Sequence, residues 1–143
     1  MKIKNDFPEI LNSFFTKHLQ LERRFSDNTY NTYLMVIKQY ISFLNSIGIK
    51  NNEISLNNFN KNNILNFLNY VEQQLKCSSK TRNHKLAIIN SFLEYAQSIN
   101  PVYLDIYIQS KNIKLKKVVK EKMDFMTIDE LKAFFKAINL KYK

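Results

Sequence analysis

The chain has 143 residues, 45% of them hydrophobic and 13% aromatic, and this apolar content argues against a disordered protein. One glycine and two prolines are too few for the tight turns of a strand-rich fold, and a single cysteine excludes both an internal disulfide framework and a thiolate-cluster metal site. The net charge of +10 favours a polyanionic partner, either nucleic acid or an anionic membrane surface.

The first half of the chain predicts three helices. Apolar residues recur on one helical face from Phe7 to Leu19, with Pro8 in the first turn. Ser26 offers an N-cap for a second stripe that runs from Tyr30 to Ile47, and Gly48 stands where a left-handed C-cap is expected. Residues 51–63 are polar and predict a loop with at most a short turn. The third helix should bury Ile64, Phe67, Leu68, Val71 and Leu75.

Two more helices are predicted before the lysine-rich segment that begins at residue 111. Ser78-Ser79 marks the start of a fourth helix, and Asn100-Pro101 reads as a cap followed by a first-turn proline for a short fifth helix. The stripe expected on the fourth helix is Leu86, Ile89, Phe92, Leu93 and Ala96. The stripe expected on the fifth is Tyr103, Leu104, Tyr107 and Ile108. The prediction is therefore an all-α bundle of four to five helices.

A basic segment separates this bundle from the end of the chain. Between residues 111 and 122 one acid, Glu121, faces six lysines: Lys111, Lys114, Lys116, Lys117, Lys120 and Lys122. This composition favours an extended linker over a packed element. Beyond it, Thr127-x-x-Glu130 is a capping box, with an apolar stripe behind it at Leu131, Phe134, Phe135 and Ile138. A lone helix cannot bury such a stripe, so we expect it to begin a second, mostly missing domain.

No catalytic constellation emerges. His18 lies on the apolar face of the first helix, where a packed histidine is the expected reading, and a Cys77–His84 nucleophile pair is an accidental spacing. A single glycine rules out a glycine-rich phosphate loop. Catalytic residues, a metal site and a cofactor are all expected to be lacking. No apolar run approaches the length of a membrane span, and no signal-peptide core follows the basic start, so a cytoplasmic protein without membrane partners is expected.

The clearest binding signal is the start of the fourth helix. A helix N-terminus carries partial positive charge and favours acids, yet this one holds Lys80, Arg82 and Lys85 with no acid. Cations in this position lower the stability of the helix when no ligand is bound. A bound phosphate would make the same arrangement favourable, because the helix dipole, the free N–H groups and the cations all attract it. A solvated basic surface is the alternative.

Two further segments carry weaker signals. Thr29, Asn31 and Lys38 could touch phosphates or base edges at the second helix, although capping and core packing explain their neighbours. The lysine run from residue 111 to 122 suits either a DNA backbone or a solvated linker.

Three phrases in this order resemble the tyrosine recombinase (phage integrase) family. Phe25-Ser26-Asp27-Asn28-Thr29-Tyr30 resembles the opening of its N-terminal core-binding domain. The stretch from Ser79 to Ala87, continuing from Ser91 to Ala96, is similar to the family's "S-x-x-T-x-N-x-x-L-A" helix and the aromatic phrase that follows it. Phe125 to Leu131 resembles the entry to its catalytic domain.

The resemblance implies a SAM-like bundle that forms one arm of a clamp around a recombination half-site. It divides the chain into a core-binding domain over residues 1–110, a basic interdomain linker over 111–125, and the start of a catalytic domain over 126–143. Its partners would be double-stranded DNA, the missing catalytic domain and other recombinase protomers. The expected DNA contacts, in order, are Arg82, Lys80, Lys85, Asn83, Thr81, Thr29 and Lys38, then Lys114, Lys116 and Lys117.

The family's catalytic residues have no counterparts here. Neither its arginine and lysine, nor its His-x-x-Arg box, nor its nucleophilic tyrosine matches a position before Lys143, and Tyr142 lacks the surroundings of a nucleophile. We therefore expect this segment not to cleave DNA alone, although its parent would be a tyrosine recombinase. The alternatives are a nucleic-acid binder indifferent to sequence and a helical protein-interaction module.

Overall fold

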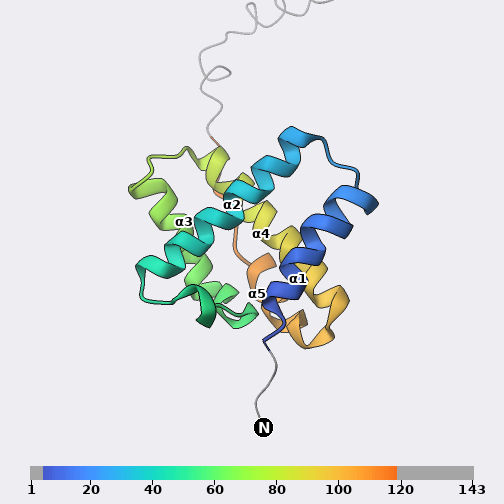
Figure 1. The fold of residues 1–143 in the computed structure, drawn as a ribbon. Coiled ribbons are helices and arrows are strands. Elements are labelled where there is room, and N and C mark those ends of the chain that lie inside the picture. The colour runs from blue at the N-terminus through green and yellow to red at the C-terminus, as the bar shows by residue number, and fades with distance from the viewer. Residues whose placement is uncertain (1–4, 119–143) are drawn as a thin grey trace, which may run out of the picture.

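The computed structural model describes residues 5–118, and all regular secondary structure in this part of the chain is helical, with no strand. The α-helices are α1 (Phe7–Ser13), α2 (Asp27–Ser46), α3 (Lys61–Gln73), α4 (Ser79–Ile99) and α5 (Leu104–Lys111). The other helical segments are the π-helix η1 (Phe14–Glu22) and the 3-10 helices η2 (Asn51–Glu53), η3 (Leu56–Phe59) and η4 (Pro101–Tyr103). The predicted all-α bundle is confirmed (Figure 1).

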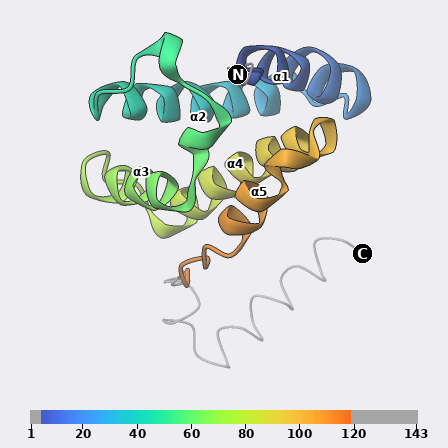
Figure 2. The ribbon, with the colours of Figure 1, turned by 90° about the horizontal axis from the view of Figure 1, so that it is seen from below.

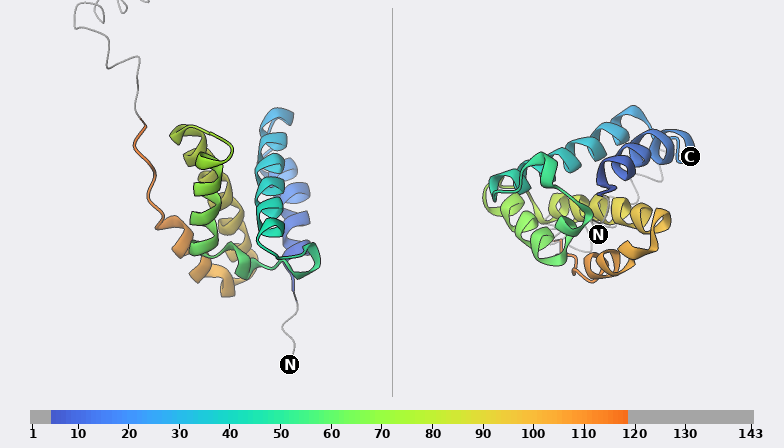
Figure 3. Two further views of the ribbon diagram at one scale, coloured as in Figure 1. Left: turned by 90° about the vertical axis from the view of Figure 1, so that its left-hand side faces the viewer. Right: turned by 60° about the horizontal axis from the view of Figure 1, so that its bottom comes forward.

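Helix α4 is the centre of the bundle. It packs against α1, η1, α2, α3 and α5, so it contacts every other α-helix of the bundle. Helices α1 and α2 lie together on one side of α4, whereas α3 and α5 lie on the other (Figures 2 and 3). The beginnings of α2 and α4 lie at the same end of the bundle, and segment 114–118 runs toward that end on the side of α4 away from α2 (Figures 1 and 3). Among residues 5–118, no helix is long and apolar enough to cross a membrane.

Aromatic rings dominate the core between these helices. Phe92 of α4 is fully buried, and its ring centroid lies 5.4 Å from that of Phe14 and 5.3 Å from that of Phe59. Tyr40 of α2 stacks on Phe59 at 4.6 Å. Edge-to-face and offset contacts of this kind add stabilisation beyond the area that the rings bury.

Tyr40 is also the polar anchor of the α2–α3 connection. Its hydroxyl donates a hydrogen bond to the Asn58 carbonyl at 2.6 Å, and burial raises the pKa of the phenol far above its ordinary value. Tyr40→Phe should lower the free energy of unfolding by about 1 kcal/mol, as measured by urea denaturation. The cost stays small because the same carbonyl still accepts from Asn63 Nδ2 at 3.1 Å. A loss of about 3 kcal/mol or more would mean that Asn63 does not satisfy the carbonyl.

Several local predictions are confirmed. Ser26 caps α2, Ser78 caps α4 and Asn100 caps η4, each by accepting a hydrogen bond from a backbone N–H. Gly48 follows α2 with φ of +97°, the left-handed conformation that glycine adopts without strain. The five residues of the predicted α4 stripe are all buried.

The first helix and the following connection differ from expectation. The run from Phe7 to Leu19 is not one α-helix, because it widens into a π-helix from Phe14 onward. The polar stretch 51–63 is more ordered than a loop: it forms η2 and η3, and α3 already begins at Lys61. Buried Ile54, Leu56 and Phe59 anchor it to the core, which explains the extra order.

Two predicted apolar faces are wrong in part. Leu75 lies beyond the end of α3 and is 41% exposed. On the fifth helix, Leu104 and Ile108 face solvent, whereas Tyr103 and Tyr107 pack against the core as expected. Its inward face continues to Ser110, whose hydroxyl bonds to Asn90, so that a polar contact replaces part of the apolar stripe.

The basic segment is only partly a free linker. Lys111 is the last residue of α5, and Ile113 is buried, so the bundle extends slightly past residue 110. Residues 114–118 are extended, as predicted, but they pack against the start of α4. Lys120, Glu121, Lys122, the Thr127–Glu130 capping box and the helix expected behind it lie outside the described residues.

Candidate nucleic-acid interface

Two matching helix starts define the candidate site. Ser26 Oγ accepts from the Thr29 backbone N–H at 3.3 Å and bonds its hydroxyl at 3.0 Å. Ser78 does the same with Thr81, at 3.2 Å for each contact. The shared Ser-x-x-Thr pattern thus caps both helices at the same end of the bundle, and it leaves the other first-turn N–H groups directed outward.

A basic residue in a left-handed conformation precedes each of these caps. Arg24 has φ of +49° and Lys76 has φ of +56°, and both are exposed. The next N–H in each case reaches back to the preceding helix, from Phe25 to the Leu19 carbonyl and from Cys77 to that of Val71. Left-handed backbone costs a non-glycine residue about 1–2 kcal/mol. Glycine would remove that cost, yet both positions carry a cation.

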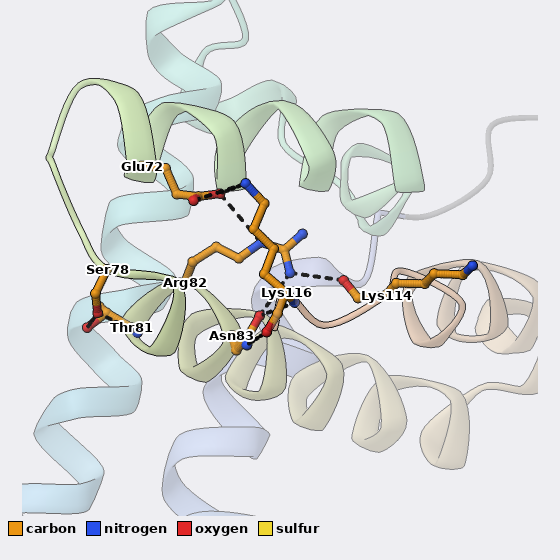
Figure 4. Close-up of polar contacts among 7 residues, drawn as sticks. All are labelled: Glu72, Ser78, Thr81, Arg82, Asn83, Lys114 and Lys116. Atoms are coloured by element: carbon orange, nitrogen blue, oxygen red, sulfur yellow. Dashed lines mark hydrogen bonds and ion pairs between the residues drawn. The ribbon is translucent and has the colours of Figure 1, made fainter. Parts of the chain in front are cut away.

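Arg82 turns inward rather than toward solvent. It is 5% exposed, and Nη1 donates to Asn83 Oδ1 at 2.9 Å and to the Lys114 carbonyl at 3.0 Å. Nε lies 3.8 Å from a Glu72 carboxylate oxygen and has no hydrogen-bond partner among the described residues. The guanidinium therefore joins α3, α4 and the segment after α5 (Figure 4).

Lys85 is also internal. It is 4% exposed, and its ammonium donates to Gln39 Oε1, which links α4 to α2. Burial lowers the pKa of Lys85 below its ordinary value, an effect that the electrostatic interaction with Cys77 partly opposes. Lys38, which precedes Gln39 on α2, is exposed and accessible to an external ligand.

Asn83 and Lys116 engage each other. Asn83 Nδ2 donates to the Lys116 carbonyl at 2.7 Å, and the Lys116 N–H donates to Asn83 Oδ1 at 2.9 Å. The Lys116 ammonium lies 2.8 Å from one oxygen of Glu72 and 3.0 Å from the other. Both residues are predicted DNA contacts, but in this structure their polar groups join the segment after α5 to α3 and α4 (Figure 4).

The remaining predicted contacts stay at the surface. The exposed or half-buried side chains among them are Lys80, Thr81, Thr29, Lys38, Lys114 and Lys117. A surface depression of about 700 Å³ lies among Lys80, Thr81, Asn83, His84, Ala87 and Leu115. Five of these residues belong to α4 and Leu115 belongs to the returning segment, so the two elements share one surface.

Sequence reasoning missed Glu72 and Gln39. Glu72 sits in the last turn of α3, where the helix dipole disfavours an acid, just as the α4 start disfavours Arg82. Their pairing offsets both costs, and two such misplacements on either side of one turn are a signal that sequence could have supplied. Gln39 carries no comparable signal, because a polar residue on a helix surface is ordinary.

Comparison with known proteins supports a common origin. The sequence profile of the family described as phage integrase, N-terminal SAM-like domain, matches residues 13–99. Proteins named tyrosine recombinase XerC from Staphylococcus aureus strains USA300, COL and MRSA252 are each 26% identical over 125 residues, covering 87% of this chain. The chain spans 39% of the length of these relatives. No solved structure matches it at a significant level.

Proposed function

The chain belongs to the phage integrase family through its N-terminal SAM-like domain, and from this premise we propose that it binds the core-site DNA of a site-specific recombinase. The proposed interface is the end of the bundle where α2 and α4 begin. The rest of the parent protein would supply strand cleavage, and residues 111–125 and 126–143 would connect to and begin that catalytic domain. Other protomers of the recombinase would complete the assembly on DNA.

The observation that carries this proposal is the basic, acid-free start of α4 beside an extended basic segment. The first turn of α4 holds no acid, and Lys80 on α4 and Lys114 and Lys117 on the adjacent segment are exposed. Cations and free N–H groups so placed attract phosphate rather than a neutral ligand. Arg24 and Lys76, which close the helices before the two caps, are exposed and add positive charge near the starts of α2 and α4.

Titrating the chain with duplex DNA at several salt concentrations tests the proposal by fluorescence anisotropy. Lys80→Ala/Lys117→Ala should weaken binding by about ten- to a hundredfold and reduce the slope of log affinity against log salt by about 2, because each lysine releases roughly one counterion. Lys50→Ala/Lys61→Ala removes the same charge from exposed positions next to the α2–α3 connection and should change neither quantity.

The choice of DNA separates the alternatives. Preference for the recombination core site over scrambled DNA supports a core-site clamp, whereas salt dependence without preference reduces the role to backbone binding. Equal effects from both double variants would mean that net charge, not this surface, attracts DNA. Absence of binding at low salt would favour a helical protein-interaction module.

A further inference from the structure

The segment after α5 turns back and lies along the start of α4. Ile113 is buried, and its N–H donates to the Ser110 carbonyl at 3.1 Å, which fixes where the segment begins. Arg82 then holds the carbonyl of Lys114, and Asn83 holds both backbone groups of Lys116. These contacts join residues more than thirty positions apart in the sequence. The start of the basic segment is thus fixed at three points.

The contact at position 114 uses only the backbone, so the side chain of Lys114 remains available. The carbonyl of Lys114 accepts from Arg82, while the Lys114 ammonium is left exposed, and Lys117 is exposed as well. Lys116 is the exception, because Glu72 takes its ammonium. We call the contacts of Asn83, Arg82 and Glu72 with residues 114–116 the latch (Figure 4).

The latch uses most of the hydrogen-bonding groups of the Asn83 side chain. Its oxygen accepts from Lys116 N–H and from Arg82 Nη1, and its amide nitrogen donates to Lys116. A side-chain amide has two N–H donors and two lone pairs, so one donor is left. An asparagine that read a base edge would need both its donor and its acceptor for the bidentate pair. The geometry favours a structural use.

We propose that Asn83 is a positioning residue, whose latch fixes the course of the basic segment along the start of α4 before DNA arrives. An unanchored lysine run would lose backbone and side-chain freedom on binding, and a run already held in place avoids much of that cost. The inference rests on the proposed DNA-binding function, but its first consequence is measurable without DNA.

Amide hydrogen exchange of Lys116 tests the latch directly, because this N–H donates to Asn83. Asn83→Ala in the full chain should accelerate exchange at Lys116 by roughly tenfold or more, the equivalent of one or two net hydrogen bonds. Asn66→Ala makes the same change at an exposed position of α3; it is the matched control and should leave exchange at Lys116 unchanged. Amides of the buried core, such as that of Phe92, report whether Asn83→Ala preserves the fold. Equal exchange at Lys116 in wild type and Asn83→Ala would show that no latch exists.

A double-mutant cycle then separates positioning from contact. Asn83→Ala should weaken DNA binding several-fold in the wild-type background, with an unchanged salt slope because asparagine is neutral. In a Lys114→Ala/Lys117→Ala background, which keeps the backbone contacts of the latch, the same substitution should have no further effect. An equal loss in both backgrounds would show that Asn83 touches DNA, overturning the positioning role. Failure of wild-type protein to bind DNA would instead remove the proposed function and leave the exchange result standing.

Discussion

Phe92→Ala should lower the free energy of unfolding by about 3–5 kcal/mol, the largest effect of any substitution considered for this chain. Phe92 is fully buried in the central helix, and its ring contacts Phe7, Phe14 and Phe59 from three different elements. Removing the ring forfeits its burial and leaves a cavity that the surrounding rings cannot fill without leaving their own contacts. Urea denaturation followed by far-UV circular dichroism measures the loss.

The expected loss is large relative to the stability of a small domain. Such domains are stable by about 5–15 kcal/mol, so the variant should be marginally folded or unfolded at 37 °C. Val102→Ala provides the control: Val102 is 70% exposed, and its truncation should change stability by less than about 0.5 kcal/mol. A cost below about 1.5 kcal/mol for Phe92→Ala would mean that the core collapses around the missing ring and that α4 is not its centre.

Local sequence signals predicted the elements of this fold well. The serine caps, the glycine after α2 and the stripe on α4 each depend on residues within one or two helical turns, and all are present. The π-helix of η1 carried no such signal, because its apolar spacing fits an α-helix equally well. The order of residues 51–60 was missed since Ile54, Leu56 and Phe59 are too few to show a period, yet each finds a place in the core.

The candidate site was predicted less well than the fold. Sequence reasoning selected the start of α4 from its inverted charge pattern. It could not distinguish cations that face solvent from cations that face the protein, because that depends on partners distant along the chain. Lys85 meets Gln39 across 46 positions, and Asn83 meets Lys116 across 33. Lys80 and Arg82 are two residues apart, yet one is exposed and the other buried.

Arg82→Ala separates these two kinds of cation most sharply. Arg82 headed the expected DNA contacts, but its guanidinium is buried against Glu72 and the Lys114 carbonyl. Removing it leaves that carbonyl without this donor and the carboxylate with Lys116 alone, so stability should fall by about 3 kcal/mol, the lower end for removing one partner of a buried pair. Urea denaturation of the variant measures this loss.

Lys80→Ala is the matched control for Arg82→Ala, since it removes one positive charge from the same helix start. Lys80 is exposed, so this variant should keep its stability within about 0.5 kcal/mol and lose DNA affinity. Arg82→Ala should therefore act mainly on stability, and Lys80→Ala mainly on DNA binding. Glu72→Gln combined with Arg82→Ala should cost less than the sum of the single changes, because the unpaired carboxylate is then gone. If Arg82→Ala instead keeps full stability and weakens core-site binding by about 1–3 kcal/mol, the guanidinium leaves Glu72 for the DNA, and the buried contacts describe only the unbound protein.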